Sequence, residues 1–417
     1  NPPWVRAERL APAFRVRLSQ RFRLWRSQDK SGFAHLPDLS VAFLERFLEL
    51  AAPGGAVALL VPSKVASAGY GEAMRHHLVR ETTVRYLHRL PDRQAARFGA
   101  TTYPLAIIAQ KAAPPHDHRI QLGFGTSAGV RQAALQGPGP WILVPSRGRE
   151  ALERFRASGV PLRDVVTPQL GVKTGADDVF VGKLIAKRGA LAVVRFGSEE
   201  VPIEIGVLRP IVRGRDVKPF RTSATRVIVW ACDRRGRPSP SLPPRAAAYL
   251  ERHRARLEQR SDYRGGPLWT VFRTGSALAP NRIIWPDIAR RPCAVMLDAT
   301  NQHDALPLNS CYIASVRTRM TALAITAILN SSWFAALAAV IASEARGGYR
   351  RVNASVVAQL PVPRTQRGLS DLAAVTERAQ RNDDISLDDV DAAVAEALDL
   401  SPTVRHELKE LGSLHRR

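Results

Sequence analysis

Residues 38–63 read DLSVAFLERFLELAAPGGAVALLVPS, and this stretch carries the strongest fold signal in the chain. Its first half places apolar residues at helical spacing on one face, namely Phe43, Leu44, Phe47, Leu48 and Leu50. Pro53-Gly54-Gly55 ends the helix, and residues 56–61 form a continuous apolar run that is typical of a buried strand. Helix, turn and strand therefore predict one αβ unit of a parallel sheet.

Two later segments extend this unit into a domain. Residues 72–79 predict a second helix and residues 83–87 a second strand, while the apolar run at 104–109 predicts a third strand. We therefore expect an α/β domain over residues 1–115. The Pro- and Gly-rich residues that follow predict a connector over residues 116–164.

The chain starts with Asn1-Pro2-Pro3-Trp4, and each of these residue types has a chemical use. An exocyclic amine on an aromatic ring is a poor nucleophile because its lone pair is delocalised into the ring. The Asn1 side-chain oxygen and the Pro2 carbonyl could each accept one N–H of such an amine, which would aim the lone pair at an incoming group. The prolines stiffen the loop, and Trp4 offers a flat face for a base. An ordinary Pro-Pro turn beside a surface Trp is the alternative.

From residue 165 onward, short strand-like pieces alternate with turns. Clustered Arg, Lys, Gly and Asn in such loops suit contacts to phosphates and to the edges of DNA grooves. The motifs that stand out are those at 170–180, 208–220, 282–288, 329–332 and 348–363.

Taken in order, these motifs resemble the amino-group DNA methyltransferases of restriction–modification systems, in the adenine-N6 class with a TaqI-like C-terminal specificity domain. The resemblance implies a partial Rossmann-like methyltransferase domain over residues 1–115. It further implies a mixed α+β target-recognition domain over residues 165–363. Residues 364–417, acidic and periodic, predict a helical tail.

The resemblance also implies an activity and a site. A methyl group would pass from S-adenosylmethionine to N6 of an adenine flipped out of duplex DNA. Asn1, Pro2, Pro3 and Trp4 would form the catalytic loop, and the adenine would stack between Trp4 and Phe98. Asp38 and Phe43 are the candidates in this chain for contacting the methyl donor.

The chain departs from the family at the donor site. In the family, a Gly-rich turn and a ribose-binding acid precede the Asn-Pro-Pro loop. We therefore expect this chain to lack the N-terminal cofactor-binding half and to be inactive alone. That half, or a restriction subunit, is an expected partner. Gly123-Phe124-Gly125 is the alternative donor loop, against a hairpin-like connector.

The net charge of the chain also favours DNA as the partner. The 61 basic and 37 acidic residues give a net charge of +24, an excess that favours a polyanion such as double-stranded DNA. The basic stretch at 6–26 could face DNA or form an amphipathic helix with solvated arginines, and the charged stretch at 245–260 predicts a solvated helix. The basic residues within the motifs are the expected DNA contacts, namely Lys173, Arg213, Arg215, Lys218, Arg350 and Arg351.

Cysteine usage and hydropathy bear on metal binding, cellular compartment and membrane association. Cys232, Cys293 and Cys311 have no metal-ligand spacing and are odd in number, so we expect no metal and a reducing cytoplasm. The apolar residues 321–343 are interrupted by Asn330-Ser331-Ser332, which predicts a buried helix and no membrane association.

Two other functions remain open. One is methylation of RNA adenine or of a glutamine side chain, which the long segment at 165–363 disfavours. The other is a DNA-binding specificity module without catalysis. The recognised DNA sequence, a fused nuclease and the oligomeric state cannot be read from these residues.

Overall fold

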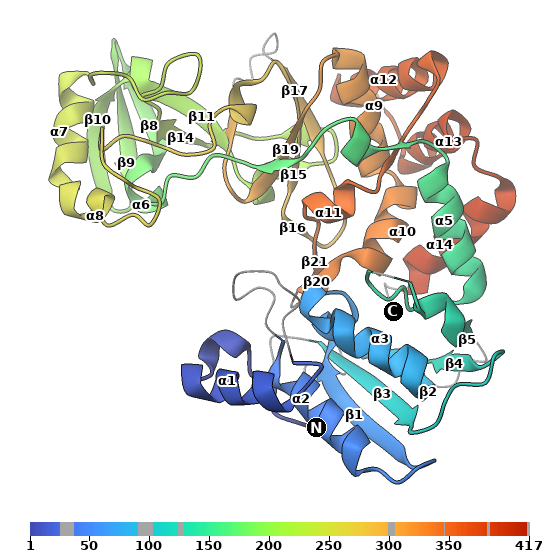
Figure 1. Ribbon diagram of the computed structural model, residues 1–417. Coiled ribbons are helices and arrows are strands. Elements are labelled where there is room, and N and C mark those ends of the chain that lie inside the picture. Colours follow the sequence, from blue (N-terminus) through green and yellow to red (C-terminus); the bar gives the residue numbers. More distant parts are fainter. Residues whose placement is uncertain are drawn as a thin grey trace. The chain divides into compact units, whose positions relative to one another are not determined.

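The computed structural model describes residues 1–25, 37–90, 103–123, 129–137, 139–298, 305–345, 347–381 and 384–414 (Figure 1). It divides into two compact units, each built from separate chain segments. Unit 1 comprises Asn1–Glu153, Ala336–Arg351 and His406–Arg417, and unit 2 comprises Arg154–Ala335 and Val352–Arg405. The predicted boundaries at residues 115, 164 and 363 stay predictions, since neither unit is contiguous.

The predicted helices and strands of residues 38–110 are present in unit 1. Asp38 caps helix α2 (Leu39–Leu50), which leads to strand β1 (Ala56–Pro62). Helix α3 (Glu72–Glu81), strand β2 (Thr83–Arg89) and strand β3 (Pro104–Gln110) follow. Leu44, Leu48, Leu59, Leu78 and Leu105 are among the apolar side chains that form its main core.

The expected parallel arrangement of this sheet is wrong in one respect. The strand order is β1-β3-β2-β4-β5, with β3 antiparallel to both neighbours. Strands β1 and β2 therefore run in the same direction without pairing to each other. An apolar run indicates a buried strand, but it carries no information on strand direction or on position in the sheet, and β1 lies at the edge.

The edge of the sheet beyond β2 is a hairpin. Strand β4 (Arg119–Leu122) pairs in parallel with β2 and antiparallel with β5 (Gly129–Arg131), and the 3-10 turn Gln132–Leu135 follows. The β4–β5 pair belongs to the sheet of unit 1, and the choice between a donor loop and a connector around Gly123 stays a prediction. Phe124 and Gly125 lie outside the described residues.

The Pro-Gly-Gly turn joins α2 to β1 through a backbone that only glycine adopts readily. Gly54 has φ 76°, and its N–H donates to the Lys111 carbonyl at 2.8 Å. A Cβ atom on Gly55 would lie 2.9 Å from the Ala52 carbonyl oxygen. The turn therefore brings the start of β1 level with the end of β3.

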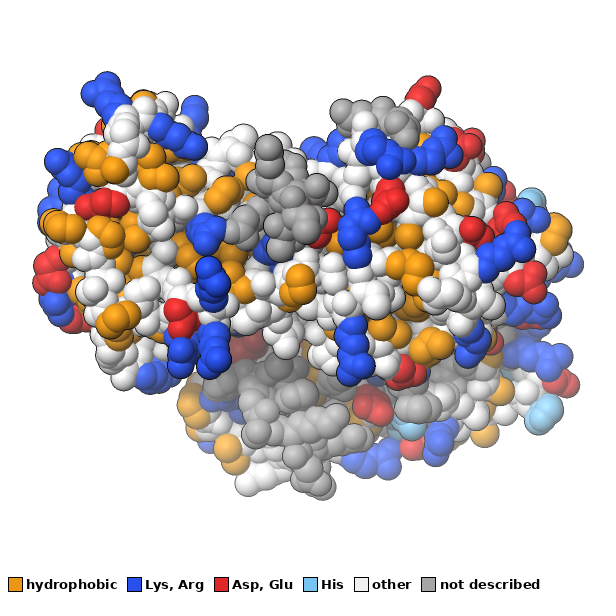
Figure 2. Space-filling view, turned by 90° about the horizontal axis from the view of Figure 1, so that it is seen from above, with side chains coloured by type: hydrophobic (Ala, Val, Ile, Leu, Met, Phe, Trp, Pro, Cys, Tyr) orange, Lys and Arg blue, Asp and Glu red, His pale blue; other side chains and the backbone are white. Residues whose placement is uncertain are grey.

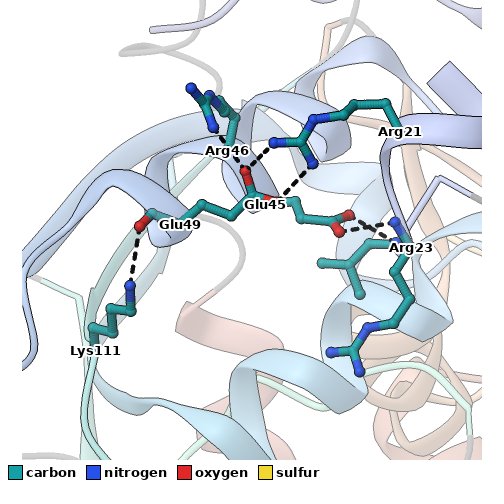
Figure 3. A network of polar contacts seen from close by, with 7 residues as sticks. Arg21, Arg23, Glu45, Arg46, Glu49 and Lys111 are labelled. Carbon is teal, nitrogen blue, oxygen red and sulfur yellow. Dashed lines mark hydrogen bonds and ion pairs between the residues drawn. The ribbon is translucent and has the colours of Figure 1, made fainter. Parts of the chain in front are cut away.

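Two glutamates of α2 hold the basic N-terminal segment (Figure 3). This segment contains the 3-10 turn Ala7–Arg9 and helix α1 (Pro12–Arg21). Glu45 accepts the backbone N–H groups of Arg23 and Leu24 at 2.8 and 2.7 Å. Glu49 accepts hydrogen bonds from Arg21 and Arg46, and its carbonyl accepts one from Lys111. Residues 12–21 are thus helical, with Leu18 buried, and the choice between a DNA-facing segment and a solvated amphipathic helix stays a prediction.

Unit 2 contains a six-stranded sheet with the order β10-β9-β8-β14-β11-β18. Helices α7 (Pro244–Arg252) and α8 (Arg254–Glu258) pack beside it through Tyr249, Leu250 and Leu257. The strands are β8 (Val181–Arg188), β9 (Leu191–Phe196), β10 (Glu199–Glu204), β11 (Leu208–Val212), β14 (Arg226–Val229) and β18 (Leu306–Pro307). This meandering, mostly antiparallel sheet confirms the α+β expectation.

A second sheet of unit 2 has the order β17-β15-β19-β7. Its strands are β15 (Asn281–Pro286), β17 (Val295–Asp298), β19 (Cys311–Ser315) and β7 (Gln169–Leu170). Short strands complete the chain: β6 (Val160–Pro161), β12 (Val217–Lys218), β13 (Arg221–Thr222), β16 (Ile288–Ala289), β20 (Ser343–Ala345), β21 (Tyr349–Arg351) and β22 (Pro361–Val362).

The apolar segment at 321–343 is broken into two helices. Helix α9 (Arg319–Asn330) and helix α10 (Ser332–Ile341) meet at Ser331 with a bend of 66°. The Asn330 side chain donates to the Thr326 and Ala294 carbonyls and accepts the Ala294 N–H. No single helix in the described residues is long and apolar enough to span a membrane, and these two pass that test only together.

The C-terminal segment is helical, as expected. It contains α12 (Gln366–Gln380), α13 (Leu387–Ala397) and α14 (Pro402–Leu414). The other helices are α5 (Ser146–Ala157), α6 (Asp177–Phe180) and α11 (Ala354–Val357). Ser386 and Asp389 form a capping box at the start of α13.

Candidate functional site

The loop Asn1–Trp4 is held near the carboxyl end of β1. The indole N–H of Trp4 donates to the Leu60 carbonyl at 3.2 Å. The Val5 carbonyl accepts the Leu39 N–H at 2.9 Å, and Arg6 forms a backbone bridge with Asp38. Strand β1 and the start of α2 therefore both hold the segment that follows the loop.

The loop itself combines a buried anchor with exposed polar groups. Pro2 is buried and Trp4 half-buried, whereas Asn1 and Pro3 are exposed. The fixed φ of proline and the Trp4 hydrogen bond limit how far the backbone can move. An amide oxygen on a stiff surface loop beside an anchored aromatic ring can accept a hydrogen bond from a ligand amine.

The two candidates for contacting the methyl donor lie at the start of α2. Asp38 is 6% exposed, its carboxylate accepts the Ser40 N–H at 3.0 Å, and burial raises its pKa. Phe43 is half-buried, with its ring 5.9 Å from that of Phe47. Because Asp38 serves as a helix cap, these two residues do not by themselves form a donor pocket, and their predicted role stays a prediction.

Phe98, predicted to stack on the target base, lies outside the described residues, which resume at Tyr103. Tyr103 starts the approach to β3 and is 6% exposed. Its hydroxyl donates to the Ala345 carbonyl at 3.1 Å, so the β20–β21 hairpin packs at this end of the unit 1 sheet.

Sequence reasoning missed Lys64 and Tyr70, which follow β1. Burial lowers the pKa of Lys64, and the charges of Arg6 and Arg351 act in the same direction. Burial also raises the pKa of the Tyr70 hydroxyl, with the Asp38 charge adding to the shift. Lys64 directly follows the Val-Pro-Ser end of β1, which is the sequence signal for this position.

Four of the predicted DNA contacts lie in unit 2, and they differ in exposure and in ion pairing within the protein. Lys173 forms an ion pair with Asp262. Arg213 is largely buried, lies 3.9 Å from Asp177, and has its pKa lowered by burial. Arg215 and Lys218 are exposed. Figure 2 shows Lys and Arg side chains spread over the face in view, with fewer acidic side chains between them.

The other two predicted DNA contacts, Arg350 and Arg351, lie in unit 1 on strand β21. Arg350 is opposite Glu344 of β20, and its guanidinium lies 3.4 Å from the Glu344 carboxylate. Arg89 at the end of β2 approaches the same carboxylate at 4.0 Å. Burial lowers the pKa of Arg350 despite Glu344. Arg350 therefore serves a buried ion pair, which makes it a weak candidate for contacting phosphate, whereas Arg351 is exposed.

Thiols and acids do not converge on a metal site in the described part of the chain. No group of three or more His, Cys, Asp or Glu side chains is placed there to hold a metal ion. Burial raises the pKa of Cys232 to about 12 and that of Cys293 to about 11, so both stay protonated. The expected cytoplasmic location stays a prediction.

Comparisons with known proteins match two separate parts of the chain. Residues 1–95 match the family model described as Eco57I restriction-modification methylase. Residues 209–362 match the model of the TaqI-like C-terminal specificity domain. A curated relative, the Type II methyltransferase M.XhoI of Xanthomonas vasicola, is 23% identical over 92% of this chain and 72% of its own length.

A solved structure supports the fold. The Type IIL restriction-modification enzyme MmeI, solved in complex with DNA, matches 99% of this chain with a TM-score of 0.57 and 11% identity. The chain spans 53% of the MmeI chain. The matches over residues 1–95 and 209–362 therefore relate the chain to restriction–modification methyltransferases with a TaqI-like C-terminal specificity domain.

Proposed function

We propose that this chain belongs to a site-specific DNA methyltransferase that transfers a methyl group to N6 of an adenine flipped out of duplex DNA. The observation that carries the proposal is the Asn1–Trp4 loop. Its Trp4 is hydrogen-bonded to Leu60 near the carboxyl end of β1, and its Asn1 is exposed. Ligands of α/β sheets bind outside the carboxyl ends of strands, which is where this loop lies.

The chain's own residues would position the amine. The Asn1 side-chain oxygen and the Pro2 carbonyl each accept one N–H of the exocyclic amine, and Trp4 stacks on the base. S-adenosylmethionine, when bound, supplies an electrophilic methyl group. Two aligned acceptors direct the nitrogen lone pair toward that group. Neither acceptor is basic, so the proton that the amine loses passes to water.

The specificity domain supports DNA over the other acceptors. Unit 2 provides a large basic domain after the catalytic loop, and its residues 209–362 match a specificity domain. A glutamine or an isolated RNA base would need no such domain. The placement of the activity in a restriction–modification or phage-defence system rests on the same family match.

The test is identification of the methylated product. The complete protein is incubated with isotope-labelled S-adenosylmethionine and either duplex DNA or structured RNA, and each nucleic acid is digested to nucleosides. We expect the label in N6-methyladenine. Label in N4-methylcytosine would overturn the base assignment, and label only in RNA would overturn the substrate. DNA binding without any label would favour a specificity module that lacks catalysis.

A further inference from the structure

Three basic side chains lie in a row across the six-stranded sheet of unit 2. Arg226 of β14 is directly opposite Lys183 of β8, and Lys183 is directly opposite Arg195 of β9. Directly opposite residues share one face of a sheet, with Cβ atoms about 5 Å apart. Phe196, the neighbour of Arg195, stacks on Tyr249 of α7. Since successive side chains alternate between faces, the row points away from α7.

This row is unfavourable for the protein alone. Like charges directly opposite each other destabilise a sheet. Glu200 of β10 is opposite Arg195 and accepts its Nε–H at 3.0 Å, which offsets the positive charge at that end of the row. Lys183 and Arg226 have no ion-pair partner within the described part of the chain. Lys183 is exposed and Arg226 half-buried, so their charges meet solvent or a ligand.

The row continues toward two of the predicted DNA contacts. The charges of Arg226 and Arg215 both act on Arg213, which follows β11. Asp177, at 3.9 Å from Arg213, and Asp216 offset part of this charge. On β11 the residue directly opposite Arg226 is the buried Ile211, so the row on the sheet ends at β14, with Glu200 at its other end.

We propose that Lys183, Arg195 and Arg226 form a phosphate-binding row on which the backbone of double-stranded DNA lies. Three adjacent strands at about 4.8 Å spacing give a row about 10 Å long, comparable with about three 3.4 Å steps along a DNA helix axis. A polyanion removes the repulsion within the row. The choice of DNA as that polyanion rests on the proposed function.

The row is tested by salt titration of DNA affinity. Full-length wild type is compared with Lys183→Ala, Arg226→Ala and Glu200→Gln, using a duplex that contains the target site and one that does not. Arg254→Ala is the matched control, because Arg254 is an exposed arginine of α8 outside the row and its loss changes net charge equally. Thermal unfolding of each variant verifies folding.

Removing a basic side chain of the row and neutralising the neighbouring Glu200 should have opposite effects on DNA affinity. Lys183→Ala and Arg226→Ala should each flatten the log–log salt slope by about 0.9, so that affinity falls about threefold less between 50 and 200 mM salt. Both duplexes should be affected alike. Glu200→Gln should tighten binding, because it frees Arg195. Lys183→Ala should keep or raise the melting temperature, since it removes two like-charge pairs.

Three outcomes would overturn the row: slopes unchanged in both basic variants, an equal change in Arg254→Ala, or preference of the wild type for structured RNA of equal length. Methyl transfer by the wild type is measured in the same preparation. Wild type that methylates DNA while the row variants keep their slopes refutes the row alone. Wild type that transfers no methyl group while the variants lose slope refutes the proposed function alone.

Discussion

A single buried arginine, Arg260, shows how far one residue can depart from its sequence pattern. It ends a stretch predicted to be a solvated helix, yet it is 3% exposed. Its guanidinium donates to the carbonyls of Leu257, Thr174, Thr270 and Leu268. It also lies over the rings of Phe180, Tyr263 and Phe272. Arg260 therefore joins the end of its own helical stretch to Thr174 and to the segment 268–270.

Removing this side chain should destabilise unit 2 strongly. Arg260→Ala leaves several buried carbonyls without a donor, which should lower the free energy of unfolding by about 3 kcal/mol or more. Arg254→Ala, an exposed neighbour paired with Glu251 and Glu258, should change it little. Urea unfolding of both variants is the measurement, and equal effects would show that burial of Arg260 contributes nothing.

For single residues, the sequence pattern predicts some functional atoms but not their hydrogen-bond partners. The pattern Asn-Pro-Pro-Trp indicates which atoms could accept an amine, and the structure adds the hydrogen bond from Trp4 to Leu60. That bond links residues 56 positions apart, and no local pattern encodes such a partner. Arg350 lies in a basic motif, which predicted a DNA contact, but its side chain pairs with Glu344 on the neighbouring strand.

At the scale of elements, helix α2 positions both ends of the N-terminal segment. Its N-terminus meets Val5 through Leu39, and Glu45 and Glu49 on its exposed side hold α1 and the residues that follow. Hydrogen bonds from Arg21 and Arg46 lower the pKa of Glu49 from 4.5 to about 2. The carboxylate form of Glu49 is thus favoured in the folded state.

This shift predicts an acid-dependent contribution to stability. A carboxyl group whose pKa is lower in the folded than in the unfolded state stabilises the fold above pH 4.5 and loses that effect as pH falls through about 2. Glu49→Gln should therefore melt below the wild type at neutral pH, and the two melting temperatures should converge in acid. Glu410→Gln on α14 is the control, and a difference that is constant with pH would contradict the assignment.

Elements were largely predictable from local patterns, whereas their pairing was not. The helix at 39–50 and the strands at 56–62, 83–89 and 104–110 follow from apolar spacing and the Pro-Gly-Gly turn. The insertion of β3 between β1 and β2 depends on a long connection, which apolar spacing does not describe. The break at Ser331 was signalled by the polar Asn330-Ser331-Ser332 within an apolar segment.

At the scale of the whole molecule, chemistry and DNA contact are assigned to different units. Unit 1 contains the Asn1–Trp4 loop, and unit 2 contains the row of Lys183, Arg195 and Arg226. Each unit is built from segments far apart in sequence, and most of helix α14 belongs to unit 1. Composition indicated a polyanionic partner for the net charge of +24, but only strand register shows which charges share a face.

The assignment of methyl transfer and DNA binding to different units is tested most directly by Asn1→Ala in the complete protein. Single-turnover methyl transfer and DNA affinity are measured on the same target duplex. Loss of a positioned acceptor should slow methyl transfer about 100-fold or more and leave the dissociation constant and salt slope of the wild type intact. Near-normal methyl transfer by Asn1→Ala would contradict the account, as would a loss of activity that merely follows a loss of DNA binding.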